Sequence, residues 1–317
     1  MPRARAEPFV PLAEPERRAA AVDAVAEGGP TEGESMRTIA IVNQKGGCGK
    51  TTTTVALAGC LADGGARVLV VDLDPQAHAT LALGAVPELI ERNLYDVLAE
   101  PGGEDRLAEV LLPAGAGIDL APSGIVLSAL EQRLAAAQGD ARTRRLADCL
   151  ARLEARYDFA LVDCPPNVGL LTFNALRAAQ EVIVPLETSF FAIHGGQKLL
   201  ETIGLLSQRL GVKLRVRVLP TLYDGRTRYA RGTLAEIREL FGEACFDTVV
   251  RCNVKLREAA RRGVPISRLA PTSNGAADYG VLALELRASL GGPEEALPEA
   301  WEGRAAAPLA RPLAAPR

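Results

Sequence analysis

The sequence predicts a doubly wound α/β fold, in which a mainly parallel sheet carries helices on both faces. Short apolar runs rich in β-branched residues are typical of buried strands, and they occupy residues 38–42, 67–75, 118–123, 159–166, 181–187, 214–224 and 244–250. Helical segments separate these runs, and such alternation favours a parallel sheet buried on both faces. The glycine-rich and acidic segments follow strands, which is where ligands bind in such folds.

The first predicted strand leads into a glycine-rich turn and then a helix. The turn is NQKGGCGKTTTT, residues 43–54, and apolar residues at helical spacing follow until Gly64 and Gly65 end the helix. Backbone N–H groups and the helix N-terminus then converge on an anion, which predicts a phosphate site. The alternative is a glycine-rich turn that binds nothing.

The turn departs from the standard phosphate-binding pattern, because Gln44 stands where the first glycine belongs. It also has a second lysine, Lys45. We expect Lys50 to reach the outer phosphates and Thr51 to ligate magnesium. The candidate nucleotide-binding residues are Gly46, Gly47, Cys48, Gly49, Lys50, Thr51 and Thr52. Cys48 either fills space or offers an oxidisable thiol.

Acidic residues end two of the predicted strands. Asp72 and Asp74 close the run at 67–75, where a carboxylate can orient an attacking water or hold magnesium through water. Asp163 closes the run at 159–166, and an acid in this position meets magnesium through water. The candidate magnesium residues are Thr51, Asp74 and Asp163. A turn or a helix cap is the alternative for each acid.

Basic residues gather in residues 226–268, although the chain carries a formal net charge of −3. This segment contains ten Lys or Arg and five Asp or Glu, so its net charge is +5. A local basic face can bind phosphates without reading sequence. The alternative is a solvated helix face.

Composition sets the remaining limits. The 317 residues are 48% hydrophobic and 24% charged, as in ordinary globular proteins, and the six cysteines form no C-x-x-C pair. The sequence has no apolar run long enough to span a membrane and no signal-peptide core, so we expect the protein in the cytoplasm. Residues 1–35 and 291–317 have the composition of disordered segments, which leaves one domain at 36–290. Residues 128–157 are expected to form a long helical stretch.

Several motifs together resemble the ParA/MinD family of ATPases. The turn KGGCGKT at 45–51 resembles the family's deviant Walker A motif, DLDPQ at 72–76 its D-x-D-P-Q motif, and DCPP at 163–166 its Walker B segment. The resemblance runs from about residue 37 to 288 and is greatest to the small ParA proteins, called Soj in some bacteria. Most members have Gly-Asn where Ala77-His78 stand here, which leaves the behaviour of this switch segment open.

The resemblance implies an ATPase with ATP and Mg²⁺ as cofactors. It implies a nucleotide sandwich dimer in which Lys45 acts across the interface, with Lys50 and Asp74 as the other catalytic residues. Non-specific DNA contacts would fall on Arg226 and Lys255, to which the neighbouring Arg257 is added.

A ParB-type partner would stimulate slow hydrolysis at the nucleoid, and the cargo would be a chromosome or plasmid. One alternative is that Lys45 neutralises its own nucleotide. Others are a positioning ATPase for a protein cargo, an ATP-timed transcriptional regulator, and a metabolic enzyme such as an iron–sulfur reductase subunit or an amidoligase. A membrane cargo is not expected, because the C-terminal segment has no basic amphipathic helix of the kind that docks on membranes.

Overall fold

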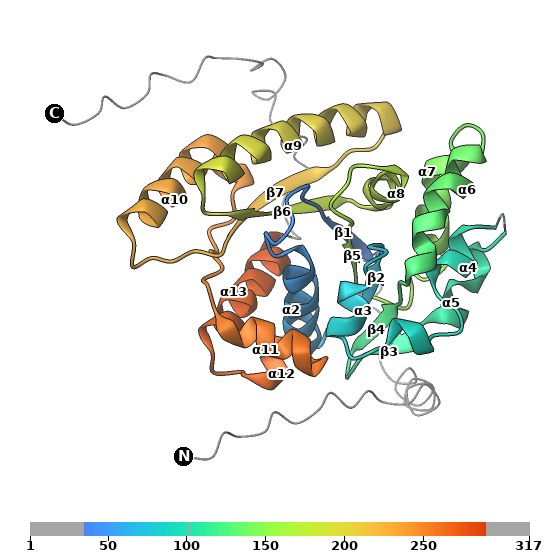
Figure 1. Cartoon of the computed structure of the whole chain (residues 1–317), viewed down its shortest axis with the longest axis horizontal. Helices are drawn as coiled ribbons and strands as arrows, with labels where there is room; N and C mark the ends of the chain where they lie inside the picture. Colours follow the sequence, from blue (N-terminus) through green and yellow to red (C-terminus); the bar gives the residue numbers. More distant parts are fainter. Residues whose placement is uncertain (1–34, 101, 290–317) are drawn as a thin grey trace.

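The computed structural model describes residues 35–100 and 102–289 (Figure 1). The predicted extension, apart from Ser35, and the predicted tail at 291–317 lie outside the described residues. The domain expected at 36–290 is described up to residue 289, except for residue 101. Within these ranges, no helix combines the length and the apolar character that crossing a membrane would require.

A seven-stranded sheet forms the centre of the domain, with the strand order β3-β4-β2-β5-β1-β6-β7. All neighbouring pairs are parallel except the short β3, which runs antiparallel to β4. The strands are β1 (Arg37–Ile41), β2 (Val68–Asp72), β3 (Leu112–Pro113), β4 (Ile118–Ala121), β5 (Phe159–Asp163), β6 (Glu181–Glu187) and β7 (Arg215–Thr221). The predicted fold class is confirmed.

Helices cover both faces of this sheet (Figure 1). Ile39 and Ile41 of β1 point into an apolar cluster on one face, whereas Ala40 points into the cluster on the other face. The face of Ile39 and Ile41 carries α2 (Lys50–Asp63), α3 (His78–Ala82), α11 (Val254–Arg262), α12 (Ile266–Leu269) and α13 (Asn274–Ala288). The other face carries α4 (Leu94–Leu98), α5 (Leu107–Val110), α6 (Leu130–Ala136), α7 (Ala141–Ala151), α8 (Leu170–Ala178), α9 (Phe190–Leu210) and α10 (Arg228–Phe241). Because strand side chains alternate between faces, each strand contributes to both cores.

Two sequence predictions about secondary structure are wrong. Residues 244–250 form no strand. They run beside β7 with one isolated bridge, between Cys245 and Val218, and with backbone hydrogen bonds from Phe246 to Val218 and from Val250 to Pro220. The helical stretch at 128–157 is interrupted between Ala136 and Ala141, where Gly139 adopts φ 57°, and α7 ends at Ala151. The sequence analysis also missed β3, whose two residues are too few to show a period.

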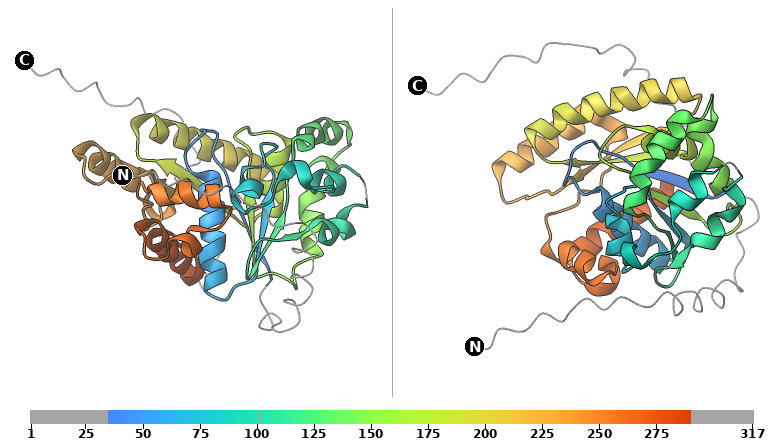
Figure 2. Two further views of the ribbon diagram at one scale, coloured as in Figure 1. Left: turned by 60° about the horizontal axis from the view of Figure 1, so that its bottom comes forward. Right: turned by 45° about the vertical axis from the view of Figure 1, so that its right-hand side comes forward.

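The carboxyl ends of the central strands meet at one edge of the sheet, which Figure 2 shows from two further sides. Asp72, the last residue of β2, lies in register with Asp163, the last residue of β5. The glycine-rich turn after β1 comes to the same edge, since β1 is the other neighbour of β5. The topology therefore brings the segments singled out in the sequence together.

Candidate nucleotide site

The glycine-rich loop has the backbone of an anion cradle. Gly47 and Gly49 adopt φ 75° and 97°, which side-chain-bearing residues rarely do. Gly49 is the N-cap of α2, so no side chain caps the first N–H groups of this 14-residue helix. A Cβ atom built on Gly46, Gly47 or Gly49 would meet no atom within 4 Å. Uncapped donors facing open space fit a phosphate group.

Lys50 lies within this cradle. Its side chain is largely buried, with 8% of the residue exposed, and Nζ donates a hydrogen bond to the Lys45 carbonyl oxygen at 3.3 Å. The charge is close enough to Asp163 to lower the pKa of that carboxyl, although burial has the larger, opposite effect. Within the described residues this buried cation has a single hydrogen-bond acceptor, a loop carbonyl oxygen, which suits it to an anionic ligand.

Thr51 and Asp163 are brought together as the sequence predicts. Thr51 Oγ1 donates to Asp163 Oδ2 at 2.7 Å, and Thr54 Oγ1 donates to Oδ1 at 3.1 Å. Asp163 is fully buried, and burial raises its pKa while these two hydrogen bonds oppose the rise. A hydroxyl beside a carboxylate is the kind of hard oxygen donor set that Mg²⁺ prefers.

The described residues hold no group of three or more His, Cys, Asp and Glu side chains that could bind a metal by themselves. Mg²⁺ at nucleotide sites usually takes one or two protein ligands and completes its shell with phosphate oxygens and waters. The donors Thr51 and Asp163 fit that arrangement. Such an ion would bridge and neutralise phosphate charge, and these two residues would hold it.

Asp74 lies just beyond the end of β2 and takes part in the turn that was its alternative explanation. Its Oδ1 accepts from the Gln76 N–H at 2.9 Å, and its carbonyl accepts from the Ala77 N–H at 2.8 Å. Its Oδ2 accepts no hydrogen bond within the described part of the chain. Asp74 is close enough to raise the pKa of Asp163. A turn with one available carboxylate oxygen is compatible with a role in orienting water.

Asp72 has a different environment from Asp74. It is fully buried and accepts hydrogen bonds from the backbone and side chain of Thr80 and from the backbone of Asp74. Burial, and next the negative charge of Asp163, raise its pKa. Asp72 therefore ties β2 to α3 rather than facing the loop's open side.

Lys45 does not lie over its own loop. Its Nζ forms an ion pair with Glu187 at the end of β6, and about 44% of the lysine side chain is exposed. Asn43 fixes the start of the loop, because Oδ1 accepts from the Lys45 N–H and Nδ2 donates to the Pro185 carbonyl. The loop backbone is thus anchored to β6, while the Lys45 amine stays near the surface.

Cys48 and Thr52, the remaining predicted loop residues, have different surroundings. Cys48 is fully buried, its carbonyl accepts from Thr221 Oγ1 at 2.8 Å, and burial raises the pKa of its thiol. A buried, protonated thiol is a poor nucleophile, so the geometry favours the space-filling interpretation. Thr52 is partly buried and lines a small cavity with Thr51 and Leu256.

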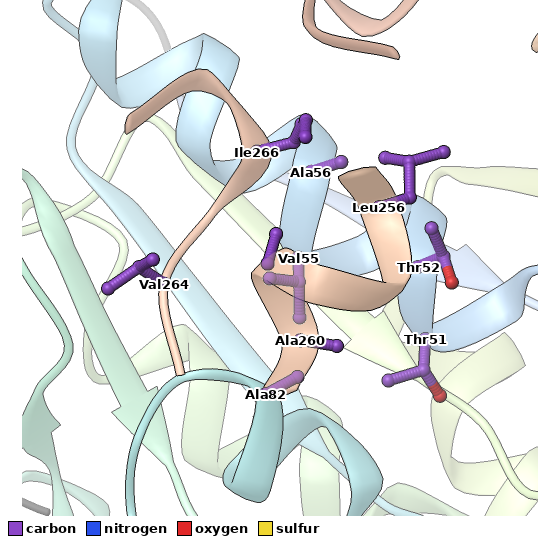
Figure 3. A pocket seen from close by; sticks show the side chains of 10 residues that line it. Thr51, Thr52, Val55, Ala56, Ala82, Leu256, Ala260, Val264 and Ile266 are labelled. Carbon is purple, nitrogen blue, oxygen red and sulfur yellow. The ribbon is translucent and has the colours of Figure 1, made fainter. Parts of the chain in front are cut away.

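That cavity of about 40 Å³ lies where α2, α3 and α11 meet (Figure 3). Thr51 and Thr52 come from α2, Ala82 from α3, and Leu256 and Ala260 from α11. It is lined mainly by small apolar groups and is too small for a nucleotide. The cavity thus lies between α2, which begins at the glycine-rich loop, and α11, which carries the predicted DNA contacts Lys255 and Arg257.

The predicted DNA contacts form a basic face, which we define as Arg226, Lys255 and Arg257. Arg226 follows β7, and the other two residues lie on α11 on either side of Leu256. Chain pairing brings the segment of Arg226 beside the start of α11, because the Cys252 N–H donates to the Tyr223 carbonyl at 3.0 Å. Arg226 and Arg257 are both close enough to lower the pKa of the Cys252 thiol, although burial raises it more.

Acidic neighbours partly neutralise this face. Arg226 forms a two-pronged ion pair with Asp224, at 2.8 Å for both contacts, and Lys255 pairs with Glu258 at 2.6 Å. Arg257 is exposed and forms no ion pair within the described part of the chain. Other basic residues of segment 226–268 pair elsewhere, Arg251 with Asp278 and Arg268 with Asp63. The net charge of +5 therefore overstates the charge available to a ligand.

Sequence reasoning missed several residues of the site. Thr54 lies three residues after Thr51, so helical spacing could have placed both on the face that meets Asp163. Glu187 ends a predicted strand, and its position at the sheet's carboxyl edge could have marked it. Asn43 and Thr221 carried no comparable signal, because their roles depend on contacts between distant segments.

The chain is similar to several known proteins. The model of a family described as an AAA domain matches residues 36–216. The sporulation initiation inhibitor protein Soj of Bacillus subtilis is 38% identical over 79% of this chain and 98% of its own length. The chromosome-partitioning ATPase Soj of Thermus thermophilus is 42% identical over 80% of this chain and 96% of its own.

A solved structure gives a further comparison. Cobyrinic acid a,c-diamide synthase from Mycobacterium smegmatis, with bound ATP analogue and magnesium, is 33% identical and superposes with a TM-score of 0.71. The match covers 81% of this chain and 96% of that one. From these matches over nearly full-length relatives, the chain belongs to the ParA/Soj family of partitioning ATPases.

Proposed function

We propose that this chain is an ATP-dependent DNA-partitioning ATPase. Its cofactors are ATP and Mg²⁺, bound by residues 46–52 and by Thr51 with Asp163, with Asp74 orienting the attacking water and touching the metal through water. The nucleotide-bound chain dimerises, binds duplex DNA without sequence preference at the nucleoid, and releases it after hydrolysis. A ParB-type partner bound to chromosome or plasmid cargo accelerates an otherwise slow reaction.

The arrangement of two lysines around one loop supports the dimer. Lys50 already occupies the cradle of its own chain, whereas the Lys45 amine is directed to Glu187 near the surface. A partly exposed ion pair of this kind contributes only about 0–1 kcal/mol, so Lys45 can exchange Glu187 for a phosphate at small cost. A cation supplied by the second subunit would stabilise charge on the transferring phosphoryl group.

The observation that carries the DNA-binding part is the contact between α2 and α11. Leu256 lines the same cavity as Thr51 and Thr52, and the basic residues Lys255 and Arg257 flank it in the sequence. A shift of α2 on nucleotide binding therefore acts directly on the helix that carries the basic face. Dimerisation also doubles the number of phosphate contacts, which strengthens binding without any new surface.

Replacement of Lys45 tests the proposal. Lys45→Ala is expected to abolish ATP-dependent dimerisation, measured by light scattering after size exclusion, while monomeric ATP binding stays within about twofold because Lys50 remains. Lys213→Ala, which removes an exposed lysine just before β7, is the control and is expected to dimerise normally. A Lys45→Ala protein that still dimerises on ATP would instead assign this lysine to its own nucleotide.

The solved Mycobacterium smegmatis relative is a cobyrinic acid a,c-diamide synthase, so an amide-forming synthase is a second candidate for this chain. Such an enzyme uses ATP together with a carboxylic acid and a nitrogen donor. The two functions differ in a simple assay of the full chain. ATP hydrolysis that needs neither co-substrate and rises with duplex DNA supports the partitioning ATPase. Hydrolysis that requires a carboxylic acid and glutamine or ammonia supports the synthase.

A further inference from the structure

A buried hydrogen-bond network encloses the backbone of Asp74. Asp72, Thr80 and Ser123 are fully buried. Thr80 donates to Asp72 Oδ2 through both its N–H and its hydroxyl, each at 2.7 Å. The Ser123 N–H donates to Thr80 Oγ1 at 3.0 Å. The network thereby joins the end of β2, the helix α3 and the segment after β4.

Two members of this network hold Asp74 directly. The Asp74 N–H donates to Asp72 Oδ1 at 3.2 Å, and Ser123 Oγ donates to the Asp74 carbonyl oxygen at 2.7 Å. The backbone of Asp74 is therefore held on both sides. Asp72 at the end of β2 holds its N–H, and Ser123 just after β4 holds its carbonyl oxygen. Only the side chain keeps an oxygen without a hydrogen bond from the described residues.

Two features of the segment are unfavourable for stability alone. Asp72 is a buried carboxylate beside the buried carboxylate of Asp163, and an apolar pair would avoid that repulsion. Ala77 adopts φ 53°, a left-handed conformation that is unfavourable for alanine. Such features persist where the surrounding structure fixes them, and they cluster at functional sites.

We propose that Asp72, Thr80 and Ser123 are positioning residues, which hold the Asp74 backbone so that its free carboxylate oxygen faces the attacking water. This proposal rests on the proposed role of Asp74 in hydrolysis. All three residues are fully buried and two of them bond to the Asp74 backbone, so their effect is expected to pass through Asp74. They govern the rate of hydrolysis rather than the affinity for nucleotide.

The test compares Thr80→Val and Ser123→Ala in the full chain at saturating Mg-ATP with duplex DNA present. Each is expected to lower the single-turnover hydrolysis rate at least fivefold, while the Kd for ATP changes less than twofold. Thr80→Ser, which keeps the hydroxyl, is expected to retain more than half of the rate. An unchanged rate in both variants, or a Kd that rises as much as the rate falls, overturns the proposal.

Thr248→Val is the matched control. Thr248 donates through its N–H and its hydroxyl to the Glu285 carboxylate, at 3.0 and 2.6 Å, just as Thr80 does to Asp72. It lies in the segment between α10 and α11 and bonds to Glu285 of α13 rather than to a residue of the Asp74 network. Its hydrolysis rate is expected to stay within twofold of the unmodified chain. A fivefold fall in this control would show that loss of any such buried contact slows the enzyme, and would overturn the proposal.

A double-mutant cycle with Asp74→Asn separates this proposal from the proposed function. If Asp74→Asn hydrolyses ATP at the rate of the unmodified chain, the proposed role of Asp74 is wrong, and the positioning proposal fails with it. If Asp74→Asn is slow, Thr80→Val is expected to add no further loss in that background. Independent, additive losses would contradict positioning through Asp74 while leaving the role of Asp74 intact.

Discussion

The nucleotide loop and the basic face both lie at the carboxyl edge of the sheet, but different interactions hold them. Around the loop, Thr51 and Asp163 are joined by hydrogen bonds, and Lys50 is largely buried. On the basic face, about 89% of the Arg226 side chain is exposed, and Lys255 pairs with a neighbour on its own helix. The first region is pre-organised and the second is adaptable.

This difference matches what each region is proposed to bind. A γ-phosphate and its Mg²⁺ need donors at fixed positions, since small displacements of catalytic groups cost large factors in rate. A DNA backbone offers repeated phosphates, and exposed, mobile cations can meet it in many registers. The comparison predicts large, specific effects from changes in the loop and smaller, salt-dependent effects from changes on the face.

The largest effect is expected from the loop lysine. Lys50→Ala should weaken ATP binding by about 100-fold or more, because it removes a desolvated cation from the phosphate cradle. Calorimetric titration with ATP and Mg²⁺ measures this. Lys255→Ala on the basic face is the control and should leave ATP affinity unchanged. Equal losses in the two variants would remove the distinction between the regions.

An intermediate effect is expected from charge reversal on the face. Arg226→Glu with Lys255→Glu should weaken DNA binding by about one to two orders of magnitude and lower the salt dependence by about two phosphate contacts per chain. Fluorescence anisotropy with duplexes of unrelated sequence, at several salt concentrations, measures both quantities. ATP affinity should not change.

The control for that pair is Arg209→Glu with Lys213→Glu. These residues carry the same charges and are exposed, but Arg209 lies in the last turn of α9 and Lys213 just before β7, at the opposite edge of the sheet. DNA affinity in the control should fall by less than about threefold, from the change in net charge alone. If the control variant bound DNA as weakly as the test pair, net charge rather than this face would govern binding.

The smallest effect is expected from the acid that pairs with Arg226. Asp224→Asn should tighten DNA binding by about two- to fivefold, because Arg226 is then free to meet a phosphate. The hydrogen bonds from Arg226 lower the pKa of Asp224 to about 2. Since the acid stays ionised well below neutrality, the gain should be constant between pH 5 and 8. A gain that vanishes toward pH 5 would show that Asp224 is protonated there, in conflict with its pairing.

The same contrast explains how much could be predicted from the sequence. The order strand, glycine-rich turn and helix is a local pattern, so it could be predicted. Once β1 and β5 are recognised as strands, the proximity of Thr51 and Asp163 follows, and the structure shows it. The ends of the parallel strands could also be predicted to meet, because chain order and strand pattern determine that edge.

Contacts between distant segments could not be predicted. No local pattern links Lys45 to Glu187, Ser123 to Asp74, or the Cys252 segment to the chain after β7. The segment 244–250 failed as a strand for a related reason. It has the apolar character of a strand, but it meets β7 through one isolated bridge and a few hydrogen bonds, an extent of pairing that the tertiary arrangement decides.

The central claim is that ATP controls binding to DNA, and it can be measured directly. Binding of the full chain to unrelated DNA duplexes should be followed without nucleotide, with ADP and with ATP, at two salt concentrations. The account predicts tight, salt-sensitive and sequence-indifferent binding only with ATP. No binding in any nucleotide state would contradict it and would identify the basic face as a solvated surface of an ATPase that acts on a protein cargo.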